Sequence, residues 1–163
     1  MDKIRVGVIG VGYLGKFHAE KYSRMEHVQL VGVADIHDRR VEEVAARFNT
    51  RAFFDYRELL GHVDAVSIVV PTEHHFSVAS ECMNHDLDVL IEKPMAATLD
   101  QADELIALAK SRGRVMQIGH LERFNPAVIA LNEIVRKPMF IEAHRLGIFQ
   151  GRSTDVSVVL DLM

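Results

Sequence analysis

Residues 4–15 read Ile-Arg-Val-Gly-Val-Ile-Gly-Val-Gly-Tyr-Leu-Gly, and they predict how the chain begins to fold. Their β-branched start favours a strand, and an amphipathic helical pattern follows the last glycine at once. Gly10 lets the chain turn sharply, Gly12 lets a phosphate approach bare backbone, and Gly15 lets the helix pack closely on the strand. The first N–H groups of such a helix lack partners within it and carry partial positive charge, so they favour an anion. The stretch therefore predicts a strand, a turn that binds phosphate, and a helix.

A second apolar run gives this turn its context. Residues 28–34 predict another strand, and Asp35 follows it, 20 residues after Gly15. A nicotinamide dinucleotide needs a carboxylate there to accept hydrogen bonds from its ribose hydroxyls. The three glycines, with Tyr13 and Leu14 between them, are thus candidates to bind the diphosphate, and Asp35 is the candidate to bind the ribose.

The start of the next helix bears on which dinucleotide is bound. Asp38 is expected to cap that helix, and Arg39 and Arg40 follow it. They lie close to where the 2′-phosphate of NADP would be. Asp35 would repel that phosphate, which favours NAD, whereas an arginine such as Arg39 turned over the adenine would also admit NADP.

Strand and helix patterns alternate along the chain to residue 118. Further strands are expected at 51–54, 65–70, 89–91 and 115–118, and the continuous apolar run at 65–70 is typical of a strand covered on both faces. This alternation predicts an α/β fold, a doubly wound parallel sheet of the Rossmann type with helices on both faces. The first helix is expected to place Leu14, Phe17, Tyr22 and Met25 against the sheet, with His18 on the same side as a packed or capping residue.

Ligands bind such sheets at the carboxyl ends of the strands, and that edge carries further polar residues. They are Pro71, Thr72 and His75 after the strand at 65–70, Glu92 and Lys93 after 89–91, and His120 after 115–118. We expect these residues to lie near the cofactor. His75 also suits a cap of the following helix, and Glu92 would orient Lys93, contact the nicotinamide ribose or lie in solvent.

Composition excludes several classes of protein. Of the 163 residues, 48% are hydrophobic, which excludes a disordered chain, and a net charge of −4 without a basic cluster argues against nucleic acid as a partner. No apolar run approaches the length of a membrane span, and no signal peptide is expected. Cys82 is the only cysteine, which fits a reducing cytoplasm, and the nine histidines lack the spacing of a metal site.

The pattern changes after residue 120. A short helix is expected to begin at Asn125-Pro126, a strand is expected at 140–149, and an apolar run at 156–163 ends with the sequence. We therefore expect a dinucleotide-binding domain at 1–120, followed at 121–163 by the incomplete beginning of an α+β substrate domain.

Taken together, these motifs resemble the Gfo/Idh/MocA family of NAD(P)-dependent oxidoreductases. The resemblance rests on the glycine turn, Pro71-Thr72 with His75, Glu92-Lys93-Pro94, and the stretch Gly-His-Leu-Glu-Arg-Phe-Asn-Pro at 119–126. The Glu-Lys-Pro segment in its place after the fifth strand is the most specific of them. Residues 119–128 and 141–145 are similar to those of the bacterial UDP-N-acetylglucosamine 3-dehydrogenases within that family.

The resemblance implies hydride transfer between a nicotinamide cofactor and a hydroxyl of a sugar or nucleotide sugar, in a full-length homo-oligomer. Lys93 matches the lysine that hydrogen-bonds the reacting hydroxyl, and an alcohol that gives up hydride must also lose a proton to some group. A cis Lys93-Pro94 bond is predicted. Arg123 and Asn125 either contact a phosphorylated or acetamido substrate or form a helix cap and a domain-interface pair.

The catalytic histidine of the family belongs to an Asp-x-x-x-His element. Asp161 fits the aspartate, but the sequence stops at Met163, so we expect this polypeptide to bind dinucleotide and to turn over substrate poorly.

Two other functions share some of these features. A regulatory module that senses dinucleotide would need the glycine turn and Asp35 but not Lys93. A methyltransferase that uses S-adenosylmethionine also carries a glycine-rich first turn and an acid after the second strand.

Overall fold

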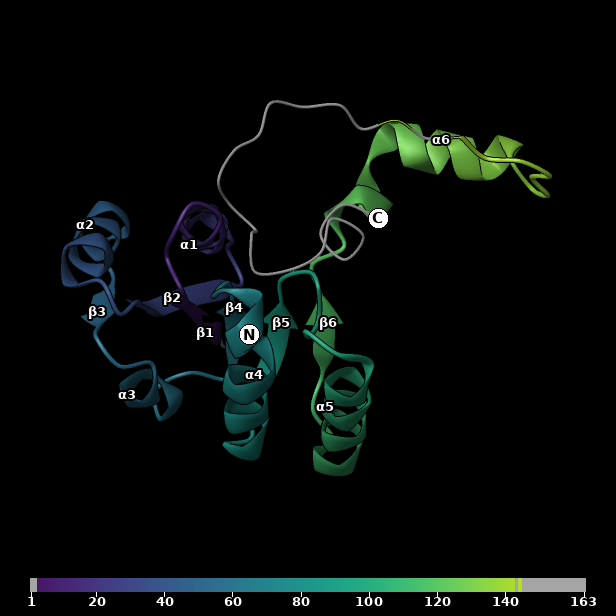
Figure 1. The fold of residues 1–163 in the computed structure, drawn as a ribbon. Helices are drawn as coiled ribbons and strands as arrows, with labels where there is room; N and C mark the ends of the chain where they lie inside the picture. The colour runs from purple at the N-terminus through teal and green to yellow at the C-terminus, as the bar shows by residue number, and fades with distance from the viewer. Residues whose placement is uncertain (1–2, 143, 145–163) are drawn as a thin grey trace.

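Six parallel strands form one sheet in the computed structural model, which describes residues 3–142 and 144 (Figure 1). The strand order is β3-β2-β1-β4-β5-β6, so the chain first moves outward from β1 in one direction and then outward in the other. The strands are β1 (Ile4–Ile9), β2 (Val28–Ala34), β3 (Arg51–Phe53), β4 (Ala65–Ile68), β5 (Asp88–Ile91) and β6 (Met116–Ile118). This order confirms the doubly wound sheet, with its switch point between β1 and β4.

Helices cover both faces of the sheet. Figure 1 shows α1 and α2 on one side and α4 and α5 on the other. The helical segments are α1 (Gly15–Arg24), α2 (Asp38–Phe48), α3 (Arg57–Leu60), η1 (Thr72–His74), α4 (His75–Asn84), α5 (Leu99–Arg112), η2 (Leu121–Phe124) and α6 (Pro126–Ile134), where η denotes a 3-10 turn. Each face has its own apolar cluster, the smaller around Val8, Val33 and Val41 and the larger around Ile68, Met83 and Leu105. Strands buried on both faces explain the continuous apolar runs.

Of the four residues of the first helix expected to pack on the sheet, only Tyr22 does so, half-buried against the cluster around Val8 and Val33. Leu14, Phe17 and Met25 are exposed, whereas Gly15 and Ala19 are buried. Small residues make the closest contact because α1 begins immediately after the turn and therefore lies close to β1 and β4. At Gly15 and Ala19 the helix lies too near to the sheet for a large side chain, whereas Tyr22 further along packs on the cluster.

The starts of α2 and α5 are capped differently. Asp38 is the first residue of α2 and not its cap, because His37 occupies the cap position and makes no capping side-chain bond. Asp38 still places negative charge in the first turn, where the helix dipole favours it. At α5 the Thr98 side chain caps the helix by accepting a hydrogen bond from Gln101 N at 3.2 Å.

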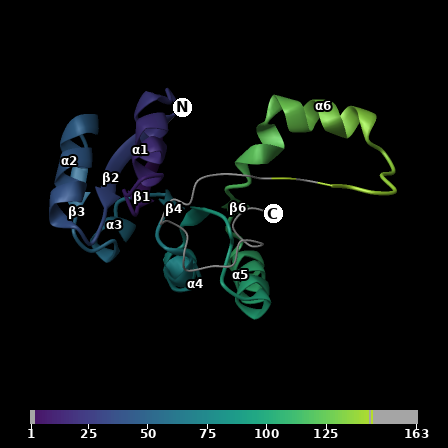
Figure 2. The same cartoon turned by 45° about the horizontal axis from the view of Figure 1, so that its top comes forward.

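The chain beyond β6 leaves the sheet. Figures 1 and 2 show α6 standing apart from the strands, and none of its residues is buried. Residues 140–142 do not form a strand, and apart from His144 the remainder of the strand expected at 140–149 and the run at 156–163 lie outside the described residues. Within the part that is described, no helix is long and apolar enough to cross a membrane.

Candidate active site

The three glycines of the turn after β1 have different surroundings. Gly10 has φ of +86°, and a Cβ there would lie 2.5 Å from the carbonyl oxygen of Val69. A Cβ on Gly15 would lie 1.8 Å from the carbonyl oxygen of Gly10, so no side chain fits where α1 meets the turn. A Cβ on Gly12 would meet no atom within 4 Å. Gly10 and Gly15 are therefore required by the fold, and Gly12 alone presents open backbone, as a diphosphate requires.

Asp35 lies against this turn, as a ribose-binding carboxylate should. Its Oδ2 accepts a hydrogen bond from Val11 N at 2.9 Å, and its Oδ1 accepts one from His37 N at 3.0 Å. The guanidinium of Arg40 lies 3.4 Å from the carboxylate, whose side chain is only 5% exposed. Backbone donors and Arg40 thus hold the carboxylate beside the open backbone of Gly12.

A pocket of about 490 Å³ lies between the glycine turn and α2. Its lining residues are Val11, Gly12, Tyr13, Lys16, Arg40, Glu43, Val44 and Arg47. Three of these side chains are cationic and only Glu43 is anionic, so the pocket favours a negatively charged ligand. The turn, the carboxylate and the cationic pocket fit the diphosphate and adenosine ribose of a dinucleotide.

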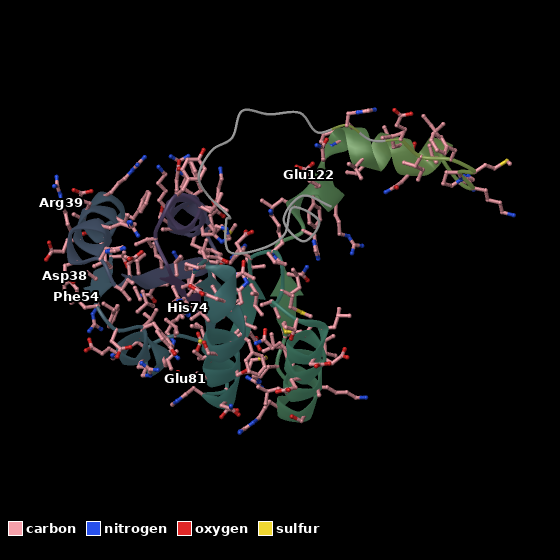
Figure 3. The ribbon with its side chains drawn as sticks, in the orientation of Figure 1. Asp38, Arg39, Phe54, His74, Glu81 and Glu122 are labelled. Atoms are coloured by element: carbon pink, nitrogen blue, oxygen red, sulfur yellow. The ribbon has the colours of Figure 1, made fainter. Side chains whose placement is uncertain are left out.

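Arg39, the arginine singled out from the sequence, does not line this pocket. Its side chain is 92% exposed and pairs with Glu43 at 2.9 Å, one helical turn away. Figure 3 shows Arg39 and Asp38 on the outer side of α2. The residue that faces Asp35 is its neighbour Arg40, because consecutive residues of a helix point about 100° apart.

Glu92, at the end of β5, is buried and not solvated. Its Oε1 lies 3.1 Å from His18 Nε2, and its Oε2 accepts a hydrogen bond from Lys93 N at 3.2 Å. Burial acts to raise the pKa of Glu92, but the hydrogen bond and charge of His18, together with Lys93, lower it below its ordinary value. A Cβ on Gly119 would lie 2.8 Å from Oε1, so the position after β6 that lies against this carboxylate has room only for glycine.

His18 continues this network into the sheet. Its Nδ1 lies 3.2 Å from Ser67 Oγ on β4, and the Tyr22 hydroxyl lies 2.7 Å from the same oxygen. Burial raises the pKa of Tyr22, which keeps its hydroxyl protonated. His18 is therefore a packed residue, as expected, but it packs against a carboxylate next to the candidate catalytic lysine.

His75 connects the segments that follow β4 and β5. Its ring is buried, with Nδ1 2.8 Å from the Pro94 carbonyl oxygen and Nε2 2.9 Å from the Val70 carbonyl oxygen. The side chain makes no helix-capping bond, so the expectation of a cap is wrong. The Lys93-Pro94 peptide bond is cis, as predicted.

The remaining candidates follow the carboxyl ends of β4, β5 and β6, at one edge of the sheet, but they differ in burial. Thr72 is buried in η1, Lys93 is partly buried, and Pro71 and His120 are exposed. Beyond β6, Arg123 is exposed, whereas Asn125 caps α6 by accepting a hydrogen bond from Ala127 N at 3.0 Å. Asn125 also donates to Glu122 at 2.8 Å, which confirms its role as a cap.

Sequence reasoning missed Lys16 and Arg47 at the pocket and Ser67 and Tyr22 in the buried network. No short motif marks them, because their partners are brought together by the sheet. Only the presence of polar residues within otherwise apolar segments, as at Ser67 in residues 65–70, signalled that something polar lies in the core. Among the described residues, no group of three or more His, Cys, Asp or Glu side chains is arranged to hold a metal ion.

Comparison with known proteins adds to this geometry. The model of the Gfo/Idh/MocA oxidoreductase family, with an NAD-binding Rossmann fold, matches residues 4–120. The UDP-N-acetylglucosamine 3-dehydrogenase of Acidithiobacillus ferrooxidans is 46% identical over the whole chain, and the chain covers 52% of it. A solved structure of that dehydrogenase, GnnA, superposes with a TM-score of 0.90 over 100% of this chain and 54% of the other.

A more distant solved structure carries a cofactor. GenD2 from gentamicin A biosynthesis, in complex with NAD, is 29% identical and superposes with a TM-score of 0.80 over 82% of this chain and 39% of the other. The chain thus spans about half the length of the relatives that it matches. With a matching family model over residues 4–120 and a glycine turn that suits its cofactor, the chain belongs to the Gfo/Idh/MocA oxidoreductase family, whose Rossmann domain binds NAD.

Proposed function

We propose that the whole protein to which this chain belongs is an NAD-dependent dehydrogenase of sugars. Its proposed substrate is the nucleotide sugar UDP-N-acetylglucosamine, which it oxidises at the 3-hydroxyl. The 46% identity with a UDP-N-acetylglucosamine 3-dehydrogenase over the whole chain supports this substrate. Residues 1–120 form the dinucleotide-binding domain, and residues from 121 onward begin the substrate domain.

The chain's own residues provide the cofactor site. The open backbone at Gly12 and the N-terminus of α1 receive the diphosphate, and Asp35 accepts hydrogen bonds from the adenosine ribose. NAD supplies the hydride acceptor when bound. Pro71, Thr72 and the turn after β5 lie at the same edge of the sheet, where the nicotinamide half of an extended dinucleotide would reach.

Lys93 is the proposed catalytic residue. The substrate hydroxyl must release a proton as its carbon gives up hydride, and a lysine amine at the carboxyl end of β5 can accept and relay that proton. The observation that carries this assignment is the way the Lys93 turn is held from two sides, through Glu92 and through the bond from His75 to the Pro94 carbonyl. Backbone held on both sides of Lys93 fixes the point from which its side chain extends, and proton transfer at a reacting carbon requires such positioning.

Arg123 is the proposed contact for the diphosphate of a nucleotide sugar. It is exposed, and a guanidinium suits bidentate contact with phosphate oxygens. Asn125 positions α6 beside it and does not reach the substrate, because its side chain is already bonded to Ala127 N and Glu122.

Exchanging Lys93 in the whole protein tests the proposal. With NAD and UDP-N-acetylglucosamine, Lys93→Ala should lower kcat by roughly 10²- to 10⁴-fold while NADH still binds. Lys110→Ala, which changes an exposed lysine on α5, is the matched control and should leave kcat unchanged. Undiminished sugar oxidation by Lys93→Ala would overturn the mechanism. A wild-type protein that binds NADH and oxidises no sugar would instead be a dinucleotide-sensing module.

A further inference from the structure

A buried polar chain connects the helix behind the glycine turn to the turn that carries Lys93. His18 lies in the first turn of α1, and its ring bridges Ser67 on β4 and Glu92 at the end of β5. Glu92 then accepts the backbone N–H of Lys93. The sheet places these groups together, although 74 residues separate His18 from Glu92 in the sequence.

Every arrangement of protons that satisfies Glu92 places a proton on His18 Nε2. A carboxylate only accepts, so Glu92 needs an N–H from His18 Nε2 as well as the N–H of Lys93. The other ring nitrogen, Nδ1, bonds the Ser67 hydroxyl, which also bonds the Tyr22 hydroxyl. His18 Nε2 is thus the donor that completes Glu92, whichever way the Ser67 and Tyr22 hydroxyls point.

The ring of His18 is occupied within the protein. Both nitrogens have partners, and the side chain is only 15% exposed. This leaves no ring nitrogen to bind a cofactor or substrate directly. Its effect on Lys93 must therefore pass through Glu92.

We propose that His18 is a positioning residue for Lys93, acting through Glu92. The inference rests on the proposed function, in which Lys93 takes the proton of the reacting hydroxyl. His18 holds one oxygen of the carboxylate, and the other oxygen holds the Lys93 backbone. Because α1 starts at the glycine turn, the same chain ties the direction of Lys93 to the helix whose N-terminus receives the diphosphate.

Kinetics of the whole protein test this role. His18→Leu removes both ring contacts and should lower kcat by roughly 10- to 100-fold, as small misplacements of reacting groups do, while KM for NAD stays within about threefold. His18→Gln can still donate an N–H to Glu92 and should recover most of the rate. His27→Leu, the same exchange at an exposed histidine, is the control and should leave kcat unchanged.

The kinetic outcomes distinguish this inference from the proposed function. If Lys93→Ala abolishes turnover and His18→Leu leaves kcat intact, only the positioning role is wrong. A rise in KM for NAD with unchanged kcat would make His18 a cofactor contact and would also overturn it. If Lys93→Ala is fully active, the proposed function itself fails.

A spectroscopic measurement tests the proton chain without turnover. Long-range proton–nitrogen correlation spectra of the ¹⁵N-labelled chain identify which ring nitrogens of His18 carry protons. We expect a proton on Nε2 at neutral pH, and Glu92→Gln should shift that nitrogen signal. A neutral ring protonated on Nδ1 alone would face Glu92 with a lone pair and would overturn the inference.

Discussion

At the scale of single residues, the glycine turn offers a matched pair of substitutions. A Cβ on Gly15 would lie 1.8 Å from backbone, whereas one on Gly12 would meet nothing within 4 Å. Gly15→Ala should therefore lower the stability of the fold by several kcal/mol, while Gly12→Ala should change it by about 0.5 kcal/mol or less. Thermal unfolding of both variants measures this.

Adding NADH to the wild type and to Gly12→Ala tests whether this glycine is needed for cofactor binding as well as for stability. A ligand that prefers the folded state raises the melting temperature, so NADH should raise that of the wild type. It should not raise that of Gly12→Ala, because the new methyl group occupies the space where the diphosphate approaches. A normal NADH response in Gly12→Ala would show that the diphosphate does not lie over this glycine.

His75 is a second residue whose surroundings decide its role. Replacing it by Leu keeps an apolar body but removes the ring N–H that donates to a carbonyl oxygen, of Pro94 through Nδ1 or of Val70 through Nε2. The free energy of unfolding should fall by about 1–3 kcal/mol, because the buried carbonyl oxygen loses its donor. Urea denaturation measures this loss, and His74→Leu, an exchange at the exposed neighbour, should change stability by less than about 0.5 kcal/mol.

At the scale of elements, the orientation of α2 decides which arginine faces Asp35 and the pocket. Arg40 faces Asp35 and the pocket, and Arg39 faces solvent (Figure 3). Arg40→Ala should weaken binding of NADPH more than that of NADH, because it removes a cation near the position of the 2′-phosphate. Arg39→Ala should change neither Kd. Isothermal titration with both cofactors measures the two ratios, and equal effects of the two exchanges would contradict this orientation.

The start of α5 gives a prediction about stability alone. Thr98 caps the helix, and Gln101 reaches back to Ala97 N at 3.2 Å, so the two side chains satisfy neighbouring donors. Thr98→Ala should cost about 1 kcal/mol of the free energy of unfolding, and Thr98→Ser should recover most of it. NADH affinity should stay unchanged, because the cap is a structural feature of this helix. An unaltered urea midpoint in Thr98→Ala would show that the cap contributes nothing.

At the scale of the whole molecule, acid should weaken the fold in part through Glu92. Its pKa in the folded chain lies below the ordinary value of about 4.3, so the folded state favours the ionised carboxylate. That contribution is fully present above the unfolded pKa and is lost as the pH falls through the lower folded pKa. Urea denaturation between pH 7 and pH 3 should show stability declining below about pH 5.

A matched pair of glutamates separates this contribution from general acid effects. Glu92→Gln should make the decline shallower, whereas Glu104→Gln, at an exposed position on α5, should leave the pH dependence as it is in the wild type. Asp64 and Glu81 also have lowered pKa values, held by hydrogen bonds from Arg5 and from Tyr56 respectively, so some decline must persist in Glu92→Gln. An identical pH dependence in Glu92→Gln and wild type would contradict the role of Glu92.

The sequence by itself determined the order of the elements, the doubly wound sheet and the glycine turn. Each follows from local rules, namely residue periodicity and the freedom of glycine. The cis Lys93-Pro94 bond was predicted together with the family resemblance of the Glu-Lys-Pro segment. Tertiary structure decided which side of a helix faces the site and which polar groups meet. Arg40 rather than Arg39 faces Asp35 because of how α2 is rotated against the sheet, although the two residues are close in the sequence. His18 reaches Glu92 because the strand order brings together residues 74 positions apart, which no local pattern encodes.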